Sequence, residues 1–492
     1  MQRPQIRLFV LDMEPMEPPR GKTLFELLWD DHLVADMGDG NGLIAIDRVL
    51  LHERTGGVAL QGLEKAGRTL LDKSQVFATM DHIVDTLPGR SDVTQMPTGT
   101  AFITATRAGA HDAGITLFDL GDPRQGICHV ISPEQAIVLP GLTLVCPDSH
   151  TGTQGAIGAL AWGIGSSEAE HAMATGTLRV KKPGTMRVTV RGTLGAGVTA
   201  KDLALHLLAR LGAAGASGFS VEFAGEAVTG LDLAGRLTLC NMATEMSAFG
   251  ALIAPDAVVI DYLKGRPFAP RGGEWDLAVA DWARLKSAPD AMFDRDVMVD
   301  GSEVAPMVSW GTSPQQVAPV DGIVPEFDSV AHRETREGYD RALAYMAVTP
   351  GERLDALPID AAFIGSCTNS RLPDLRRAAD VVRGHKVAAG VRAICVPGSG
   401  AVRAAAEAEG LDQVFLDAGF EWREPGCSMC FFAGGESFGP QARVISSTNR
   451  NFESRQGPGT RTHLAAPEVV AASAIAGHIA DARLLAPFSE AH

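Results

Sequence analysis

The stretch VRAICVPGSGAVRAAAEAEG (residues 391–410) runs from an apolar segment through a proline–glycine turn into an alanine-rich helical pattern. A strand that turns directly into a helix is the unit from which layered α/β domains are built. The preceding AAFIGSC (residues 361–367) is another apolar strand pattern, and it ends in a glycine–serine turn. These two segments predict an α/β unit in the last third of the chain.

The middle of the chain has the same organisation. GTMRVTVRGTL (residues 184–194) alternates apolar and polar residues with the period of a strand. In VTAKDLALHLLARLG (residues 198–212), Thr199 is a suitable N-cap with Asp202 three residues later, and Gly212 stands just past the apolar face. A strand followed by a well-capped helix predicts a second α/β unit.

A third unit is expected at the start of the chain. GLTLVCPDSH (residues 141–150) looks like a buried strand that runs into a polar loop, and the alanine- and glycine-rich segment at residues 155–176 is expected to be helical. Loops at the carboxyl ends of strands are where α/β folds place ligands. The stretch at residues 293–345, rich in proline, glycine and charge, is expected to be a connector. We predict three α/β/α units over residues 21–182, 183–300 and 301–492, the last of which opens with most of this connector.

Composition limits the functions open to the chain. Its 492 residues are too many for one core, which agrees with about three domains. The net charge of −16 argues against a surface built to neutralise nucleic acid phosphates, and the chain has no apolar run long enough to span a membrane. The first twenty residues lack the apolar stretch of a signal peptide, and seven cysteines do not make a disulfide framework. We expect a cytoplasmic enzyme.

The cysteines suggest metal or redox chemistry. Cys427 and Cys430 stand two residues apart in EPGCSMCFF, and Cys367 lies at the end of an expected strand. Three thiols that each follow a glycine or serine turn could converge on a cluster, but a thioredoxin-like pair and a buried Cys367 fit the spacing equally well. The remaining cysteines stand in apolar surroundings and are expected to be core residues: Cys128, Cys146, Cys240 and Cys395.

Acid–base residues occur in pairs along the chain. Asp81 precedes His82, and Asp148 lies two residues before His150 in the loop after an expected strand. A carboxylate beside an imidazole sets its tautomer and raises its basicity. Taken alone, His129 is more simply interpreted as a buried core histidine than as a catalytic residue. These side chains are candidates for proton transfer.

Arginines provide the local positive charge that an anionic substrate would need. Arg450 and Arg455 stand five apart in STNRNFESRQG, a poor spacing for one helix face, so a loop would have to bring them together. Guanidinium groups match carboxylates with two parallel hydrogen bonds. Without further context, surface salt bridges explain the pair equally well.

Eight segments, in order and over about residues 22–483, resemble the aconitase superfamily and, within it, the large subunits of 3-isopropylmalate dehydratase. The segments are KTLFELLWD (22–30), FATMDH (77–82), GDPRQGICHVISPEQ (121–135), CPDSHTGTQGAIGALAWGIG (146–165), LTLCNMATEM (237–246), FIGSCTNSR (363–371), REPGCSMC (423–430) and STNRNFESRQGPGTRTHL (447–464). The resemblance implies an aconitase-type fold and a hydro-lyase. The implied reaction is the isomerisation of 2-isopropylmalate to 3-isopropylmalate by dehydration and rehydration, in leucine biosynthesis.

The resemblance also implies a cofactor, one [4Fe-4S] cluster held by Cys367, Cys427 and Cys430. Clusters that only transfer electrons usually have every iron capped by the protein. Three thiols leave one iron open to act as a Lewis acid on a substrate hydroxyl, as an open catalytic zinc site does.

Roles for other residues follow from the same resemblance. It pairs His82 with Asp81, His129 with Asp148, and His150 with Glu245 for acid catalysis and orientation. It assigns carboxylate binding to Arg450 and Arg455, with Ser149 nearby, and a polar substrate contact to His52. In relatives, the serine base that removes the carbon proton comes from a separate swivelling domain. We expect this fourth domain to be absent from the chain and to be supplied by a small subunit in a heterodimer.

The chain departs from the pattern of isopropylmalate enzymes at Ile83, Asp85 and Gln154, which leaves the substrate open. A related hydro-lyase for 2-methylmalate and citraconate, dimethylmalate or maleate would keep every segment quoted above. Two rivals belong to other classes: an RNA-binding member of the superfamily, and a protein whose cysteines hold structural zinc or a disulfide.

Overall fold

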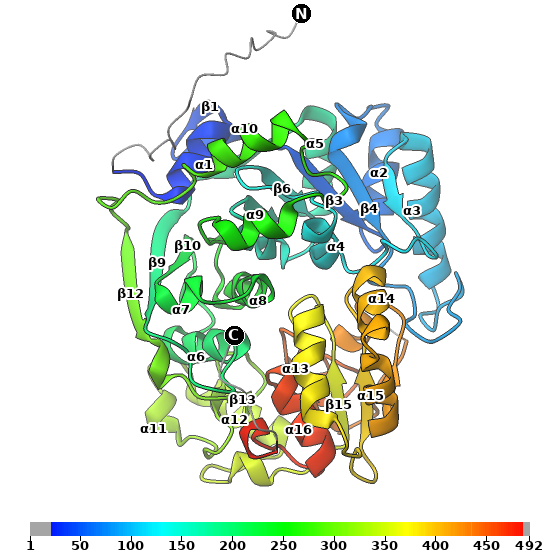
Figure 1. The fold of residues 1–492 in the computed structure, drawn as a ribbon, viewed down its shortest axis with the longest axis vertical. Coiled ribbons are helices and arrows are strands. Elements are labelled where there is room, and N and C mark those ends of the chain that lie inside the picture. Colours follow the sequence, from blue (N-terminus) through cyan, green and yellow to red (C-terminus); the bar gives the residue numbers. More distant parts are fainter. Residues whose placement is uncertain (1–20, 434, 486–492) are drawn as a thin grey trace, which may run out of the picture.

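The computed structural model describes residues 21–433 and 435–485 (Figure 1). Three larger sheets, each wholly parallel, organise these residues. The first has the order β5-β4-β3-β6-β7. Its strands are β3 (Arg48–His52), β4 (Val76–Thr79), β5 (Thr116–Phe118), β6 (Thr143–Cys146) and β7 (Leu160–Gly163).

The third sheet repeats the order of the first, and the second repeats the order of its first four strands. The second is β11-β10-β9-β12, and the third is β17-β16-β15-β18-β19. The strands of the second are β9 (Gly184–Arg191), β10 (Phe219–Ala224), β11 (Gly250–Leu252) and β12 (Arg295–Asp300). Those of the third are β15 (Ala361–Ile364), β16 (Arg392–Cys395), β17 (Phe420–Trp422), β18 (Arg443–Ser446) and β19 (Arg461–Leu464).

In all three sheets the first strand is central, the next two strands lie on one side of it, and the fourth lies on the other. This reversal of strand order creates a switch point, and ligands bind in α/β sheets outside the carboxyl ends of the strands at such a point. The topology therefore predicts a site at the carboxyl ends of β3 and β6, and another at those of β15 and β18.

Two small antiparallel sheets complete the strands of the described residues. One joins β1 (Leu33–Gly38), β2 (Asn41–Ala45) and β8 (Thr177–Lys181), and the other joins β13 (Met307–Ser309) and β14 (Val317–Pro319).

Helices surround the sheets. In the first two units they are α1 (Leu24–His32), α2 (Gly56–Lys65), α3 (Gly99–Ala113), α4 (Cys128–Glu134), α5 (Ser166–Thr175), α6 (Ala200–Leu211), α7 (Glu226–Thr229), α8 (Leu233–Ala243), α9 (Ala257–Leu263) and α10 (Gly273–Trp282). Beyond them lie α11 (Phe327–Val330), α12 (Arg336–Met346), α13 (Leu372–Val382), α14 (Gly400–Ala408), α15 (Leu411–Ala418) and α16 (Pro467–Ala476). Short 3-10 helices are η1 (Lys73–Gln75), η2 (Thr151–Ile157), η3 (Thr244–Met246), η4 (Gly301–Glu303), η5 (Leu354–Ala356), η6 (Ser428–Cys430) and η7 (Ala482–Leu484). None of the helices described here is both long and apolar enough to cross a membrane.

Helix α6 shows how the local sequence signals act. The Thr199 side chain accepts from the backbone N–H of Asp202, and the Asp202 carboxylate accepts from that of Thr199, which satisfies two free donors at the helix start. Leu203, Leu207 and their apolar neighbours are buried on one face. The predicted start and end of this helix are confirmed.

Two details of the sequence reading are wrong. The segment at residues 155–176 is not one helix, because strand β7 separates η2 from α5. A short apolar run fits a buried strand as well as a buried helix, and here pairing with β6 decides. The stretch after Phe293, read as a connector, contains β12, which pairs along β9 in the second sheet.

The packing joins the three units closely. One hydrophobic core runs without a break through the first and second sheets, and a second core surrounds the third. Figure 1 shows the third unit, coloured yellow to red, lying against the first two. The backbone N–H of Ile127 donates to the Gly398 carbonyl at 2.8 Å, and that of Gly400 donates to Gln125 at 2.8 Å. The division at residues 182 and 300 remains a prediction.

Candidate active site

The acid–base residues of the first unit lie where three neighbouring strands end. His52 is the last residue of β3, Asp81 and His82 follow β4, and Asp148 follows β6. Since parallel strands end at the same edge, these side chains meet at the switch point of the first sheet.

His82 is held at both ring nitrogens. Its Nδ1 lies 2.6 Å from Oδ1 of Asp81, and its Nε2 lies 3.2 Å from Oδ2 of Asp148. Burial alone would lower the pKa of His82, but the negative charge of Asp81 and the hydrogen bonds to both carboxylates hold that pKa well above its ordinary value. A protonated ring that donates at both nitrogens is a poised proton donor.

Asp148 is the centre of this network. Its Oδ1 accepts from Nε2 of His129 at 2.9 Å and from the backbone N–H of His150 at 2.7 Å, while Oδ2 faces His82. Burial alone would raise the pKa of Asp148, but the charge and hydrogen bond of His129, with those of the other two histidines, hold it well below its ordinary value. His129 lies buried in α4 and hydrogen bonds to Asp148, so it belongs to this network; its role in catalysis remains a prediction.

A second chain of contacts leads from His150 to the arginines. Nε2 of His150 lies 2.8 Å from Oε1 of Glu245, and Glu245 accepts from Nε of Arg450 at 3.0 Å. Nη1 of Arg450 donates to Oγ of Ser149 at 3.0 Å. Burial alone would raise the pKa of Glu245, but the hydrogen bond from His150 and the charge of Arg450 lower it. The structure thus brings together residues from the first, second and third units.

The three cysteines predicted as ligands are buried, and none of them forms a disulfide. Cys367 follows β15, and Cys427 and Cys430 follow β17, at the carboxyl edge of the third sheet. Oγ of Ser366 lies 3.2 Å from Sγ of Cys430 and 3.9 Å from Sγ of Cys367, so it bridges two of the thiols. No disulfide joins Cys427 to Cys430.

Donors surround the sulfur atoms. The side-chain amides of Asn241 and Asn449 donate to Sγ of Cys367 at 3.2 and 3.5 Å, and Nη2 of Arg455 lies 3.6 Å from Sγ of Cys430. Burial raises the pKa of Cys367 to about 12, although the Asn241 hydrogen bond acts in the opposite direction. Binding a positive metal centre would release these protons, since thiolate is the form that ligates metals.

These residues fit an iron–sulfur cluster. Three thiols with N–H donors aimed at sulfur are the ligand environment that such clusters use. Among the described residues, the three sulfur atoms do not form a set in which all lie within 4.8 Å of one another. A single zinc ion, at ~2.3 Å from each sulfur, would need thiolates about 4 Å apart. The wider spacing disfavours a mononuclear zinc site.

Asn241 and Asn449 were missed from the sequence, although both stand inside quoted segments, LTLCNMATEM and STNRNFESRQG. Lys201 was missed too. Its buried ammonium donates to the Ser447 carbonyl at 3.0 Å and to Thr448, which ties α6 to the loop before Asn449. Burial lowers the pKa of Lys201 to about 7, against the opposite effect of the nearby thiols. A lysine in the first turn of a helix carries no local signal of this contact.

Arg455 and His52 are placed differently from Arg450. Arg455 lies over the rings of Phe431 and Phe452, with its guanidinium carbon 5.7 and 5.1 Å from their centroids. His52 is buried, stacks on the ring of His82 at 4.0 Å, and lies 3.2 Å from the Pro147 carbonyl through Nε2. Burial lowers the pKa of His52 to about 4, so this ring is neutral. The substrate contact expected of His52 remains a prediction.

The three departures from the isopropylmalate pattern lie around this site. The backbone N–H of Ile83 donates to the Glu53 carboxylate, and Nε2 of Gln154 donates to the His129 carbonyl at 3.4 Å. Asp85 accepts from the backbone N–H of Gln95 at 3.1 Å. Ile83 directly follows His82 and Gln154 contacts His129, so two of the three adjoin the network.

The chain was compared with known proteins. A model of the aconitase family (aconitate hydratase) matches residues 26–477. The 3-isopropylmalate dehydratase large subunit 1 of Bradyrhizobium diazoefficiens is 50% identical over 466 residues, which covers 95% of this chain and 97% of that protein. The crystal structure of Thermococcus kodakaraensis aconitase X in its holo form covers 87% of this chain and 88% of its own, at a TM-score of 0.44 and 12% identity, too low to carry an argument.

The family model covers most of the chain and the relative covers nearly all of it, so they confirm the predicted family and α/β fold class. By these two matches, and with the parallel sheets described above, the chain belongs to the aconitase family.

Proposed function

We propose that the chain is the large subunit of a [4Fe-4S] hydro-lyase that isomerises 2-isopropylmalate to 3-isopropylmalate in leucine biosynthesis. The observation that carries this proposal is the junction of acid–base and thiol residues. The backbone N–H of Cys427 donates to the Asp81 carbonyl at 2.7 Å, and Sγ of Cys427 lies 3.9 Å from the Asp81 carboxylate. The name and 50% identity of the Bradyrhizobium protein support the choice of substrate.

Cys367, Cys427 and Cys430 would hold the cluster. Bound by these three thiolates, the cluster would supply a Lewis acid able to polarise the substrate hydroxyl. The chain's own residues then have to bind the substrate, orient it and deliver protons.

His82 is the proposed acid for the departing hydroxide. Dehydration needs a proton at the leaving oxygen, and a positioned side chain typically supplies about 10²–10⁴-fold in rate. Asp81 fixes Nδ1 of His82. Asp148 holds Nε2 in place until a substrate oxygen takes the place of the Asp148 carboxylate. His129 and His150, which both hydrogen bond to Asp148, keep that carboxylate ionised and fixed.

Substrate carboxylates are proposed to bind at Arg450 and Arg455, beside Ser149. Arg450 is partly exposed and already anchored by Glu245, so its remaining N–H groups are oriented before a ligand arrives. The chain as a whole carries a net charge of −16, and these two guanidinium groups supply the local attraction for an anion.

A partner completes the site in this proposal. The related protein is named a large subunit, and the resemblance places the base that removes the carbon proton on a separate swivelling domain. We infer a cytoplasmic heterodimer in which a small subunit brings that base.

The test is anaerobic reconstitution of the purified chain with iron and sulfide, with and without a small subunit. Turnover is measured on 2-isopropylmalate, 2-methylmalate, dimethylmalate and malate. Dehydration of 2-isopropylmalate only in the presence of the small subunit supports the proposal. Turnover by the chain alone, preference for another hydroxydiacid, or zinc in place of iron contradicts it.

A further inference from the structure

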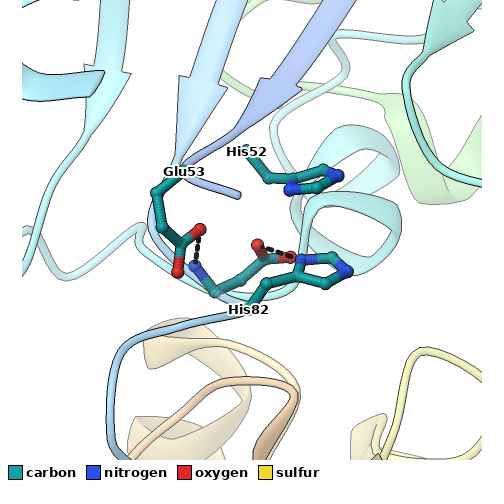
Figure 2. A group of neighbouring side chains, drawn as sticks. His52, Glu53 and His82 are labelled. Atoms are coloured by element: carbon teal, nitrogen blue, oxygen red, sulfur yellow. Dashed lines mark hydrogen bonds and ion pairs between the residues drawn. The ribbon is translucent and has the colours of Figure 1, made fainter. Parts of the chain in front are cut away.

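Glu53 is a fully buried carboxylate with no role so far. It follows His52 at the end of β3 and faces the turn that carries Asp81 and His82 after β4 (Figure 2). A buried carboxylate is costly unless its oxygens are satisfied. The partners of Glu53 therefore indicate what it does.

Three backbone N–H groups of that turn converge on Glu53. Oε2 accepts from Asp81 at 2.9 Å, and Oε1 accepts from Ile83 at 2.5 Å and from Val84 at 3.2 Å. Residues 80–86 belong to no helix or strand, so their backbone donors lack partners from regular secondary structure. The single carboxylate takes the place of those partners for the residues on both sides of His82.

A metal ion is the alternative use of this group. His52, Glu53, Asp81 and His82 offer ligand atoms that all lie within 4.8 Å of one another. Both oxygens of Glu53, however, already accept from backbone N–H groups. Oδ2 of Asp81 accepts from the Cys128 N–H at 2.8 Å, while Oδ1 faces Nδ1 of His82. Occupied lone pairs favour a hydrogen-bonded support over a cation site.

The same turn is fixed to the thiol loop on its other side. The Asp81 carbonyl accepts from the Cys427 N–H, and Oγ1 of Thr86 donates to Oγ of Ser428 at 2.7 Å. The turn thus lies between a carboxylate of the first sheet and a loop of the third. Glu53 fixes the position of this turn relative to the end of β3.

We propose that Glu53 is a positioning residue that sets the Asp81–His82 turn for proton transfer, and this role rests on the proposed function. Glu53 does not reach the substrate. It acts by fixing the backbone on either side of the acid, where an error of about 1 Å can cost about 100-fold in rate.

The substitution Glu53→Gln tests this because it keeps the shape and removes one acceptor. A glutamine oxygen can still accept from Ile83 and Val84, but its NH₂ group then faces the N–H of Asp81. Glu53→Asp keeps both oxygens on a shorter side chain and is expected to retain part of the function. The matched control is Glu222→Gln, which changes another buried carboxylate, in β10, whose side-chain partner is Ser287 at 2.6 Å.

In the reconstituted heterodimer, Glu53→Gln is expected to lower kcat about 100-fold with little change in KM, Glu53→Asp to lower it less, and Glu222→Gln to stay close to wild type. Before cluster loading, amide hydrogen exchange of a peptide covering residues 80–86 is expected to be faster in Glu53→Gln. Wild-type kcat in Glu53→Gln, or unchanged exchange in this peptide, overturns the proposal.

Two further outcomes are decisive. If Glu53→Gln does not fold, Glu53→Asp decides: a lowered kcat at an unchanged Tm supports positioning, and a wild-type kcat rejects it. If the wild-type heterodimer turns over no hydroxydiacid, the proposed function fails; exchange in residues 80–86 then still shows whether Glu53 holds the turn.

Discussion

The first and third sheets have the same strand order and opposite chemistry at their carboxyl edges. The carboxyl edge of the first sheet (β5-β4-β3-β6-β7) carries histidines and carboxylates, and that of the third (β17-β16-β15-β18-β19) carries thiols and arginines. In both, site residues follow the first and fourth strands; the others follow the interior strand β4 in the first sheet and the edge strand β17 in the third. The winding of the sheet thus decides where a site is built, and the loops decide what it can do.

Asp148 at the first edge and Cys427 at the third respond differently to burial. At Asp148, in the first sheet, hydrogen bonds and opposite charges more than offset burial, so its pKa lies well below its ordinary value. In the third, burial prevails, and it raises the pKa of Cys427 well above the ordinary value for a thiol. Metal binding at the third edge would have to displace the thiol protons.

The largest effect is expected from the thiol edge. Cys427→Ser should abolish the brown colour, the bound iron and turnover, because a cluster held by three thiolates loses one of them. Iron content and visible absorbance after anaerobic reconstitution measure this. Cys395→Ala, which changes a buried thiol inside β16, should keep all three properties. Equal loss of iron in both variants would contradict the assignment.

A substitution at the acid–base edge is expected to lower kcat and leave the bound iron unchanged. Asp148→Asn removes the charge that His82 and His129 share, so kcat should fall about 10²–10⁴-fold while iron content stays at the wild-type level. Asp300→Asn is the control, since that carboxylate, at the end of β12, accepts from the Ser302 N–H at 2.9 Å. Loss of iron in Asp148→Asn would show that the two edges do not act separately.

An arginine at the meeting of the edges should affect substrate binding. Arg450→Lys keeps the charge but lacks the two separate nitrogens, Nε and Nη1, with which Arg450 contacts Glu245 and Ser149. Charge-assisted hydrogen bonds contribute roughly 1.5–3 kcal/mol, so KM should rise about 10–100-fold. Steady-state kinetics measure this, with Arg341→Lys, which changes an exposed pair with Glu453, as the control. A fall in kcat at constant KM would instead place Arg450 in the chemical step.

The smallest effect concerns pH and stability in the third sheet. His463 in β19 lies 2.6 Å from the Ser309 carbonyl through Nδ1, and burial, with the charge of Arg443, lowers its pKa from 6.5 to about 3. The unfolded chain therefore binds more protons between these values. The free energy of unfolding should fall as pH drops below 6.5, by about 1 kcal/mol per pH unit from this residue.

Urea unfolding at pH 7 and pH 5 measures this slope. His463→Gln should reduce the acid-induced loss, while His111→Gln, on the exposed face of α3, should leave it unchanged. The same slope in His463→Gln and wild type would show that His463 is not the group responsible.

The local sequence determined the elements and the inventory of chemistry. The strand–turn–helix at residues 391–410 became β16 and α14, with Ser399 as the N-cap, because apolar period and capping groups act within a few residues. The thiols, the paired histidines and the arginines could be named as candidates because their side chains carry distinctive chemistry. The ordered segments then identified the family.

The tertiary structure alone decided which candidates meet. No local signal links Glu245 to His150, Lys201 to the loop at Thr448, or Glu53 to the turn at His82, because each contact joins residues far apart in the chain or on separate strands. Strand β7 was misread for a related reason, since pairing with β6 and not its own short apolar run made it a strand. Hydrogen bonds between distant residues depend on how sheets pack, and that packing is a property of the whole core.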